Sequence, residues 1–318
     1  VIGLIYAQLC SGFTVFCLLT YRFVEYLPPS LSKSKLKEAL QIAYPLTPRI
    51  FLGVIGTQID KYMIGLLASV GGVGIYSIGQ RISYIIFTYV SAIQNVFTPQ
   101  VYKRMFDLDE RGGESIGKYL TPFAYVCIFP ALLVSLFSEE LISTLTPSSF
   151  YGAINIVAVL AMYYGFLYFG ILAGNQLIFM KKTHVTSVLT MVSIGINVGL
   201  NIPFIMKWGA IGAAWATLLA GVISGTISFF VAQHYYEIRW EYTRIGSIFL
   251  TFFGSAILMI LLRDAGVTYY IRGAIKLMSV GVYLYTGVKA GIITTENLTL
   301  VKNILVGSNL QAVKKRTA

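Results

Sequence analysis

The sequence predicts an all-α integral membrane protein, a multi-span helical bundle. Its composition, the length of its apolar runs and the position of its charges support this prediction. Of the 318 residues, 56% are hydrophobic and only 12% are charged, whereas a soluble domain carries about 25% charged residues. A helix needs roughly 20 apolar residues to cross a bilayer core of about 30 Å. Runs of that length recur along the whole chain.

Nine apolar segments have the length of a membrane-spanning helix. They lie at about residues 1–21, 42–67, 75–102, 119–137, 150–178, 184–206, 210–233, 245–262 and 268–288. They lack the strict alternation of apolar and polar residues that marks membrane-spanning strands. We therefore expect nine transmembrane helices. Residues 22–41 are expected to form a cytoplasmic linker, either as a solvated loop or with a helix on the membrane surface.

The basic residues are placed unevenly between the two ends of these segments. Of the 24 Lys and Arg residues, seventeen fall on one side of the membrane and only Lys207 and Arg263 on the opposite side. The seventeen are Arg22, Lys33, Lys35, Lys37, Lys103, Arg104, Arg111, Lys118, Lys181, Lys182, Arg239, Arg244, Lys289, Lys302, Lys314, Lys315 and Arg316. Cytoplasmic loops are enriched in Lys and Arg. Residue 1 is therefore expected outside and the basic tail, 289–318, in the cytoplasm, as an odd number of spans also requires.

Several function classes are disfavoured by the sequence. The net charge of +11 is spread over short loops and does not indicate a nucleic-acid partner. No Cys and His residues are spaced for metal binding, so we expect neither a metal nor another cofactor. A membrane-embedded polymerase or ligase would place catalytic groups in a large outer loop, and the outer loops here are short. We therefore expect a transporter rather than an enzyme.

Five Lys or Arg residues and one acid fall inside the predicted spans, where an unpaired charge costs several kcal/mol. They are Arg49, Asp60, Lys61, Arg81, Arg272 and Lys276. Asp60 lies eleven residues before Gly71 and Arg81 ten residues after it. A rise of about 1.5 Å per residue then places both at one depth of a helical hairpin. This spacing predicts an ion pair between Asp60 and Arg81.

The excess of cations over acids among these six residues predicts an anionic ligand. Arg272 and Lys276, spaced i, i+4, share one face of their helix. A guanidinium fork matches the oxygens of a diphosphate, so all six residues are candidate substrate-binding positions. Snorkelling of the same side chains to the membrane surface is the alternative. The 22 tyrosines suit sugar rings as well as the aromatic belts of a membrane interface.

Four stretches of the sequence resemble a known family. Residues 57–65 (TQIDKYMIG) and 73–82 (VGIYSIGQRI) are similar to the seventh and eighth helices of Wzx-type polysaccharide flippases. These belong to the multidrug/oligosaccharidyl-lipid/polysaccharide exporter superfamily. Residues 197–203 (NVGLNIP) and 209–217 (GAIGAAWAT) resemble the eleventh and twelfth helices of the same family. The resemblance covers nearly the whole chain.

This resemblance implies a fourteen-span transporter with two six-helix lobes and the cargo path between them. The chain would then be a fragment that holds the sixth to the fourteenth span. Residues 1–21 would end an incomplete N-terminal lobe, 42–233 would form the C-terminal lobe, and 245–288 would add two helices before the tail at 289–318.

The resemblance also implies an activity and its partners. The cargo would be an undecaprenyl-diphosphate-linked oligosaccharide, flipped across the bacterial cytoplasmic membrane by alternating access for surface polysaccharides such as the O-antigen of lipopolysaccharide. Membrane lipids and other polysaccharide assembly proteins would be further partners. A drug or metabolite exporter and a lipid II flippase of the same superfamily are the alternatives.

Overall fold

A computed structural model describes residues 2–23, 32–108, 112–294 and 299, with only the backbone described at 2, 4, 5, 34, 35, 38, 39, 41–50, 54, 107, 108 and 112–114. Within these residues the chain is helical. The elements are α1 (Ile2–Phe23), α2 (Lys33–Leu67), α3 (Val70–Leu108), α4 (Gly112–Leu136), α5 (Ser138–Leu145), the 3-10 turn η3 (Ser148–Phe150), α6 (Ala153–Phe179), α7 (Thr183–Tyr235), α8 (Tyr242–Asp264) and α9 (Tyr269–Lys289).

The chain divides into two compact units, residues 1–48 and 49–318. The first unit contains α1 and the beginning of α2. Helix α2 begins at Lys33, so the second half of the predicted linker, 22–41, is helical and continuous with the following apolar segment. Most of the predicted tail, 289–318, lies outside the described residues.

Each of the nine predicted segments coincides with helix, but two of them share α7. This helix has 53 residues, which at about 1.5 Å per residue is far longer than a bilayer core. Gly209 interrupts it with φ 62° and ψ −137°, a backbone conformation that glycine adopts without the steric cost of a Cβ atom. Gly209 therefore separates the predicted spans 184–206 and 210–233.

Four helices of the described chain are long and apolar enough to cross a membrane: α4 from Ser115, α6, α7 and α8. This supports a membrane protein. Whether the remaining predicted segments also span the bilayer stays a prediction. The short helix α5 was not predicted, because its eight residues, SEELISTL, are too few and too polar for a spanning segment.

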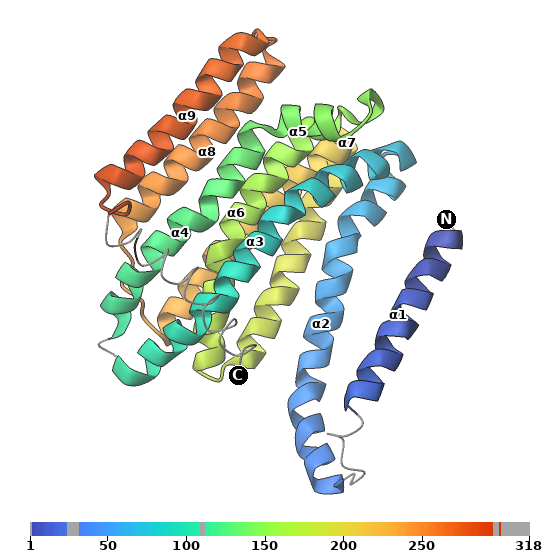
Figure 1. The fold of residues 1–318 in the computed structure, drawn as a ribbon, viewed down its shortest axis with the longest axis vertical. Helices are drawn as coiled ribbons and strands as arrows, with labels where there is room; N and C mark the ends of the chain where they lie inside the picture. Colours follow the sequence, from blue (N-terminus) through green and yellow to red (C-terminus); the bar gives the residue numbers. More distant parts are fainter. Residues whose placement is uncertain (1, 24–31, 109–111, 295–298, 300–318) are drawn as a thin grey trace. The chain divides into compact units, whose positions relative to one another are not determined.

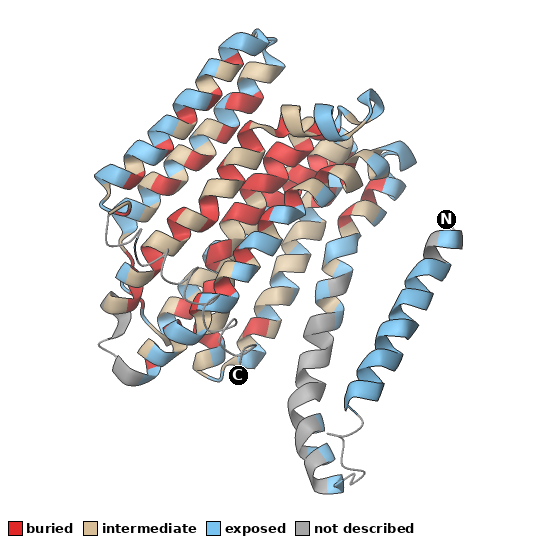
Figure 2. Ribbon diagram, viewed as in Figure 1, coloured by how far each residue is buried: buried red, intermediate tan, exposed pale blue. Residues whose placement is uncertain are grey.

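Helix α6 is the centre of the second unit. It packs against α3, α4, α7 and α8, and Figure 1 shows it between α4 and α7. Buried residues run along both α4 and α6 (Figure 2). Because helices that are apolar on all sides belong in the interior of a bundle, the sequence of α6, AINIVAVLAMYYGFLYFGILAGNQLIF, accounts for this central position.

Small residues set how closely α7 approaches α6. A Cβ atom at Gly221 would lie 2.6 Å from the ring of Tyr163, and one at Gly225 would lie 2.6 Å from the ring of Phe166. Glycine at these two positions therefore lets α7 pack closely against α6. The rings of α6 seated against these glycines also form part of a cavity wall.

The last two helices form a hairpin that packs on α4. The hydroxyl of Tyr125 donates to the carbonyl of Tyr283 at 3.1 Å, and the hydroxyl of Tyr283 donates to the carbonyl of Tyr125 at 2.8 Å. Their rings stack at 4.6 Å. This reciprocal contact joins α9 to α4 within the second unit.

Candidate functional site

A cavity of about 440 Å³ lies inside the second unit, between α2, α3, α6 and both halves of α7. This volume is within the range of about 300–1,000 Å³ that small-molecule sites occupy. The polar residues that line it are Thr57, Asp60, Tyr76, Gln80, Tyr84, Tyr163, Tyr164, Thr186, Thr190, Ser193, Asn197, Thr217, Ser224 and Ser228.

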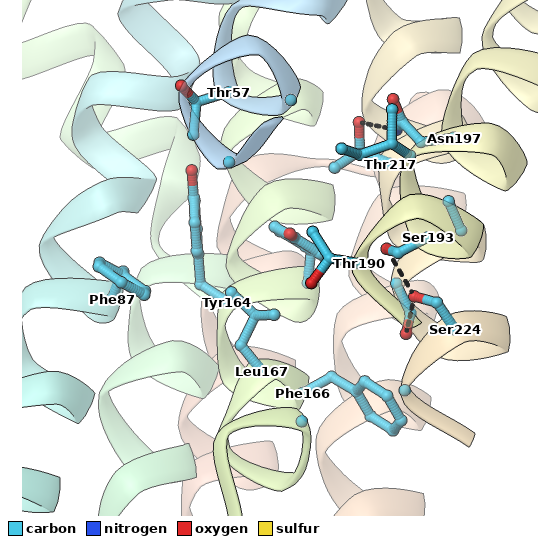
Figure 3. Close-up of a pocket in the computed structure, with 18 of the residues that line it drawn as sticks. Thr57, Phe87, Tyr164, Phe166, Leu167, Thr190, Ser193, Asn197, Thr217 and Ser224 are labelled. Atoms are coloured by element: carbon cyan, nitrogen blue, oxygen red, sulfur yellow. Dashed lines mark hydrogen bonds between the residues drawn. The ribbon is translucent and has the colours of Figure 1, made fainter. Parts of the chain in front are cut away.

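One wall of the cavity carries hydroxyl and amide groups from the two halves of α7. The Ser193 hydroxyl donates to the Ser224 hydroxyl at 3.1 Å, and the Asn197 amide donates to the Thr217 hydroxyl at 3.5 Å. Figure 3 shows these two pairs one above the other on the same side of the cavity. Hydroxyl groups both donate and accept hydrogen bonds, so this wall can bind polar ligands.

The opposite wall is aromatic and comes from α3 and α6. The rings of Tyr84 and Tyr164 meet edge to face with centroids 5.9 Å apart, and the Phe87 ring lies 6.3 Å from Tyr164. In Figure 3, Tyr164 and Phe87 lie across the cavity from Ser193 and Ser224. The cavity thus has one face of aromatic rings and one of small polar groups.

Asp60 is held at one side of the cavity by three hydrogen-bond donors. The Tyr76 hydroxyl donates to Oδ2 at 2.7 Å, the Thr217 hydroxyl to Oδ2 at 2.9 Å, and the Asn201 amide to Oδ1 at 2.7 Å. The same Asn201 amide donates to Asn197 Oδ1 at 3.0 Å. A buried carboxylate needs such partners, and here they join α2, α3 and both halves of α7.

The predicted ion pair between Asp60 and Arg81 is wrong. Asp60 is buried and takes its hydrogen bonds from neutral groups, whereas Arg81 is exposed. The depth argument placed the two residues at similar heights but could not fix their rotation about the helix axes. In place of Arg81, the neutral groups of Tyr76, Asn201 and Thr217 donate hydrogen bonds to Asp60.

Arg272 and Lys276 share a helix face, as predicted, but this face is turned toward acids of α5. Arg272 Nη1 and Nη2 donate to the Glu139 carboxylate at 2.6 and 3.1 Å, and Lys276 Nζ donates to Glu140 Oε1 at 2.5 Å. Arg263 Nε lies 3.7 Å from Glu139 Oε2. These contacts define an ion cluster that joins α5 to the hairpin of α8 and α9.

The ion cluster is close to electroneutral. Arg263, Arg272 and Lys276 face Glu139 and Glu140, and Asp264 accepts a hydrogen bond from Asn155 at 3.2 Å beside them. Burial raises the pKa of Glu140, but the hydrogen bond and charge of Lys276 outweigh it, so the pKa lies below its usual value. The cations therefore hold a protein anion in this structure.

The remaining candidate positions do not join the cavity. Lys61 is partly buried, and its Nζ donates to Gln58 Oε1 at 3.5 Å on the same helix. The side chain of Arg49 lies outside the described residues. Of the six candidates, only Asp60 lines the described cavity. The structure thus separates the candidates, and a role in substrate binding stays a prediction for each of them.

The sequence reasoning missed the partners of Asp60. Tyr76, Asn201 and Thr217 lie 16, 141 and 157 residues from it. A buried carboxylate in a chain with few acids was a signal that donors must surround it. Within the described residues no group of three His, Cys, Asp or Glu residues could hold a metal ion, and the groups that donate hydrogen bonds to Asp60 are two hydroxyls and one amide.

Two comparisons with known proteins bear on the function of this chain. Residues 1–155 match the model of a family described as polysaccharide biosynthesis protein. The chain is also 23% identical over 251 residues to the probable low-salt glycan biosynthesis flippase Agl15 of Haloferax volcanii. That alignment covers 78% of this chain and 51% of the relative, so the chain spans about half the length of the relative it matches. The family and the relative are both described as proteins of polysaccharide or glycan biosynthesis.

Proposed function

We propose that this chain forms part of a flippase that moves a lipid-linked oligosaccharide across the membrane during glycan assembly. The observation that carries this proposal is the cavity lined by hydroxyl and amide groups, because two of its four helices, α6 and α7, are long and apolar enough to cross a membrane. Polar groups inside such a bundle face a ligand path rather than lipid, because lipid leaves them without partners. Similarity to a protein named as a glycan biosynthesis flippase supports the same function.

The proposed mechanism is alternating access rather than catalysis. Helices α2, α3, α6 and α7 form one half of the cargo path, and movement of this half exposes the cavity to each side of the membrane in turn. In this proposal residue 1 lies outside, the tail lies in the cytoplasm, and the membrane is the bacterial cytoplasmic membrane. An undecaprenyl diphosphate would carry the sugar, and membrane lipids and other assembly proteins would be its partners.

A second candidate function is export of a cationic drug or metabolite. It is favoured by one observation, since Asp60 is the charged residue among those that line the described cavity, and a carboxylate attracts cations. A lipid II flippase of the same superfamily would use a similar cavity. These alternatives differ from the proposed function in their cargo and are separated by a transport assay.

Reconstituted full-length protein tests the proposal. Vesicles contain a polyprenyl-diphosphate-linked disaccharide with a fluorescent label on its sugar, and dithionite added outside quenches the label in the outer leaflet. A flippase makes nearly all of the label accessible, whereas empty vesicles retain about half of it. An exporter of cations would instead accumulate tetraphenylphosphonium and leave the inner label protected. The latter result would refute the proposed function in favour of the second candidate.

A further inference from the structure

The two unlike walls of the cavity match the two unlike faces of a sugar ring. A pyranose has an apolar face of C–H groups, which packs on aromatic rings, and an edge of hydroxyls, which donate and accept hydrogen bonds. The rings of Tyr84, Phe87 and Tyr164 form the aromatic wall. Across the cavity in Figure 3, Ser193 and Ser224 belong to the polar wall.

The charge of the cavity is unsuited to an anion. No Lys, Arg or His is among the described residues that line it, and Asp60 contributes a carboxylate. Both oxygens of Asp60 lie within hydrogen-bond distance of donor groups from Tyr76, Thr217 and Asn201, and hydrogen bonds of this kind favour the charged form of a carboxyl group. A phosphate or an acidic sugar in this space would lack charge-assisted donors and meet a like charge.

Glycines leave open space at the cavity wall. Gly53, Gly170 and Gly174 line the cavity, and a Cβ atom built on any of them would have no atom within 4 Å. Gly170 and Gly174 therefore do not pack closely against another helix, unlike Gly221 and Gly225. Space is left where a ligand can approach the backbone of α6.

We propose that this cavity binds an uncharged sugar unit of the cargo and that Asp60 excludes acidic sugars from it. The inference rests on the proposed flippase function and adds the class of sugar that it carries. The diphosphate of the cargo then binds outside this cavity, because the described lining offers it no cation. Asp60 and its three donors set the charge selectivity, while the aromatic wall supports the ring of the sugar.

Two matched cargos test this inference in vesicles that contain the full-length protein. Both are polyprenyl-diphosphate-linked disaccharides, one ending in glucose and the other in glucuronate, so they differ only in a hydroxymethyl group against a carboxylate. External periodate oxidises the vicinal hydroxyls of both terminal sugars, and the fraction oxidised over time reports transport. We expect the glucose cargo to move at least about tenfold faster, since like charges in a binding site cost several kcal/mol and 1.4 kcal/mol is tenfold.

Variants connect the selectivity to the cavity. Asp60→Asn should bring the two rates to within about threefold by removing the charge. Gly170→Leu should slow the glucose cargo about tenfold or more by filling the cavity, whereas Gly254→Leu should not. Gly254 is the matched control because it is a helical glycine on α8 with no atom within 4 Å of an added Cβ, and it does not line the cavity.

The outcomes separate the inference from the proposed function. Equal rates for the two cargos with the unmodified protein would overturn the inference while leaving the flippase function intact. Unchanged transport by Gly170→Leu would overturn it as well, even if Asp60→Asn failed to fold. Transport of neither cargo by the unmodified protein would refute the proposed function and the inference together.

Discussion

Removal of Glu139 from the ion cluster should be among the most destabilising single changes in the second unit. Glu139 accepts two hydrogen bonds from Arg272 at 2.6 and 3.1 Å and lies 3.8 Å from the fully buried Nζ of Lys276. Glu139→Ala leaves these cations with one carboxylate fewer. Each hydrogen bond to a charged group contributes about 1.5–3 kcal/mol, which sets an upper limit near ~6 kcal/mol for the two.

Partial exposure of Glu139 lowers this upper limit on the loss of stability. The Glu139 side chain is 22% exposed, so water can solvate part of the charge that remains. We expect Glu139→Ala to reduce the free energy of unfolding by about 3 kcal/mol, the lower end of the range for breaking a buried ion pair. Reversible unfolding of the purified protein in mixed micelles with increasing dodecyl sulfate measures this difference.

Glu237→Ala provides the matched control. Glu237 pairs with Arg239 at 3.8 Å, but the two side chains are 71% and 70% exposed, and exposed pairs contribute about 0–1 kcal/mol. The two variants remove the same group from a buried and an exposed ion pair. A loss below about 1 kcal/mol for Glu139→Ala, or equal losses for both variants, would refute the role of the cluster in joining α5 to the hairpin of α8 and α9.

Three further predictions follow from single contacts. Arg81→Ala should change the free energy of unfolding by less than about 0.5 kcal/mol. Tyr76→Phe should reduce it by about 1–3 kcal/mol, because it removes a donor from a buried carboxylate. Equal losses for the two variants would instead support an ion pair between Asp60 and Arg81. Gly221→Ala should destabilise by about 1–3 kcal/mol through a ring clash, while Gly170→Ala should stabilise by up to about 1 kcal/mol, and the opposite order would contradict the described packing. Because the pKa of Glu140 is lowered on folding, its contribution to the free energy of unfolding should be complete above the ordinary pKa of 4.5 and disappear as the pH falls through the folded pKa. Unfolding measured over a range of pH tests this. If Glu140→Gln lost as much stability in acid as the unmodified protein, the prediction would be contradicted.

The sequence predicted the helices better than their contacts. Apolar run length depends only on neighbouring residues, so the nine segments and the break near Gly209 could be found without a structure. Helix α5 escaped because its eight residues carry two acids and resemble a loop. A helix within residues 22–41 was one of the two alternatives, but its continuity with the next apolar segment was not predicted, because polar residues can continue a helix beyond its apolar part.

In the candidate site, too, the sequence predicted local features better than contacts between distant residues. Residue type alone identified Asp60, Arg272 and Lys276 as unusual within apolar segments. Their partners depend on packing between distant elements: Lys276 and Glu140 are separated by 136 residues, and Asp60 and Thr217 by 157. A depth estimate fixes position along a helix but not rotation about it, which is why Arg81 was assigned to Asp60.

The chain has a net charge of +11, yet no Lys, Arg or His is among the described residues that line the cavity. The placement of the charges explains this difference. A cation inside a bundle is costly unless an anion lies beside it, and Arg272 and Lys276 meet this requirement through Glu139 and Glu140. Uncompensated basic residues belong in loops, where water solvates them and where they set orientation. The basic composition therefore does not by itself indicate an anionic ligand, and the ligand class must be inferred from the few groups that face the cavity, foremost the carboxylate of Asp60.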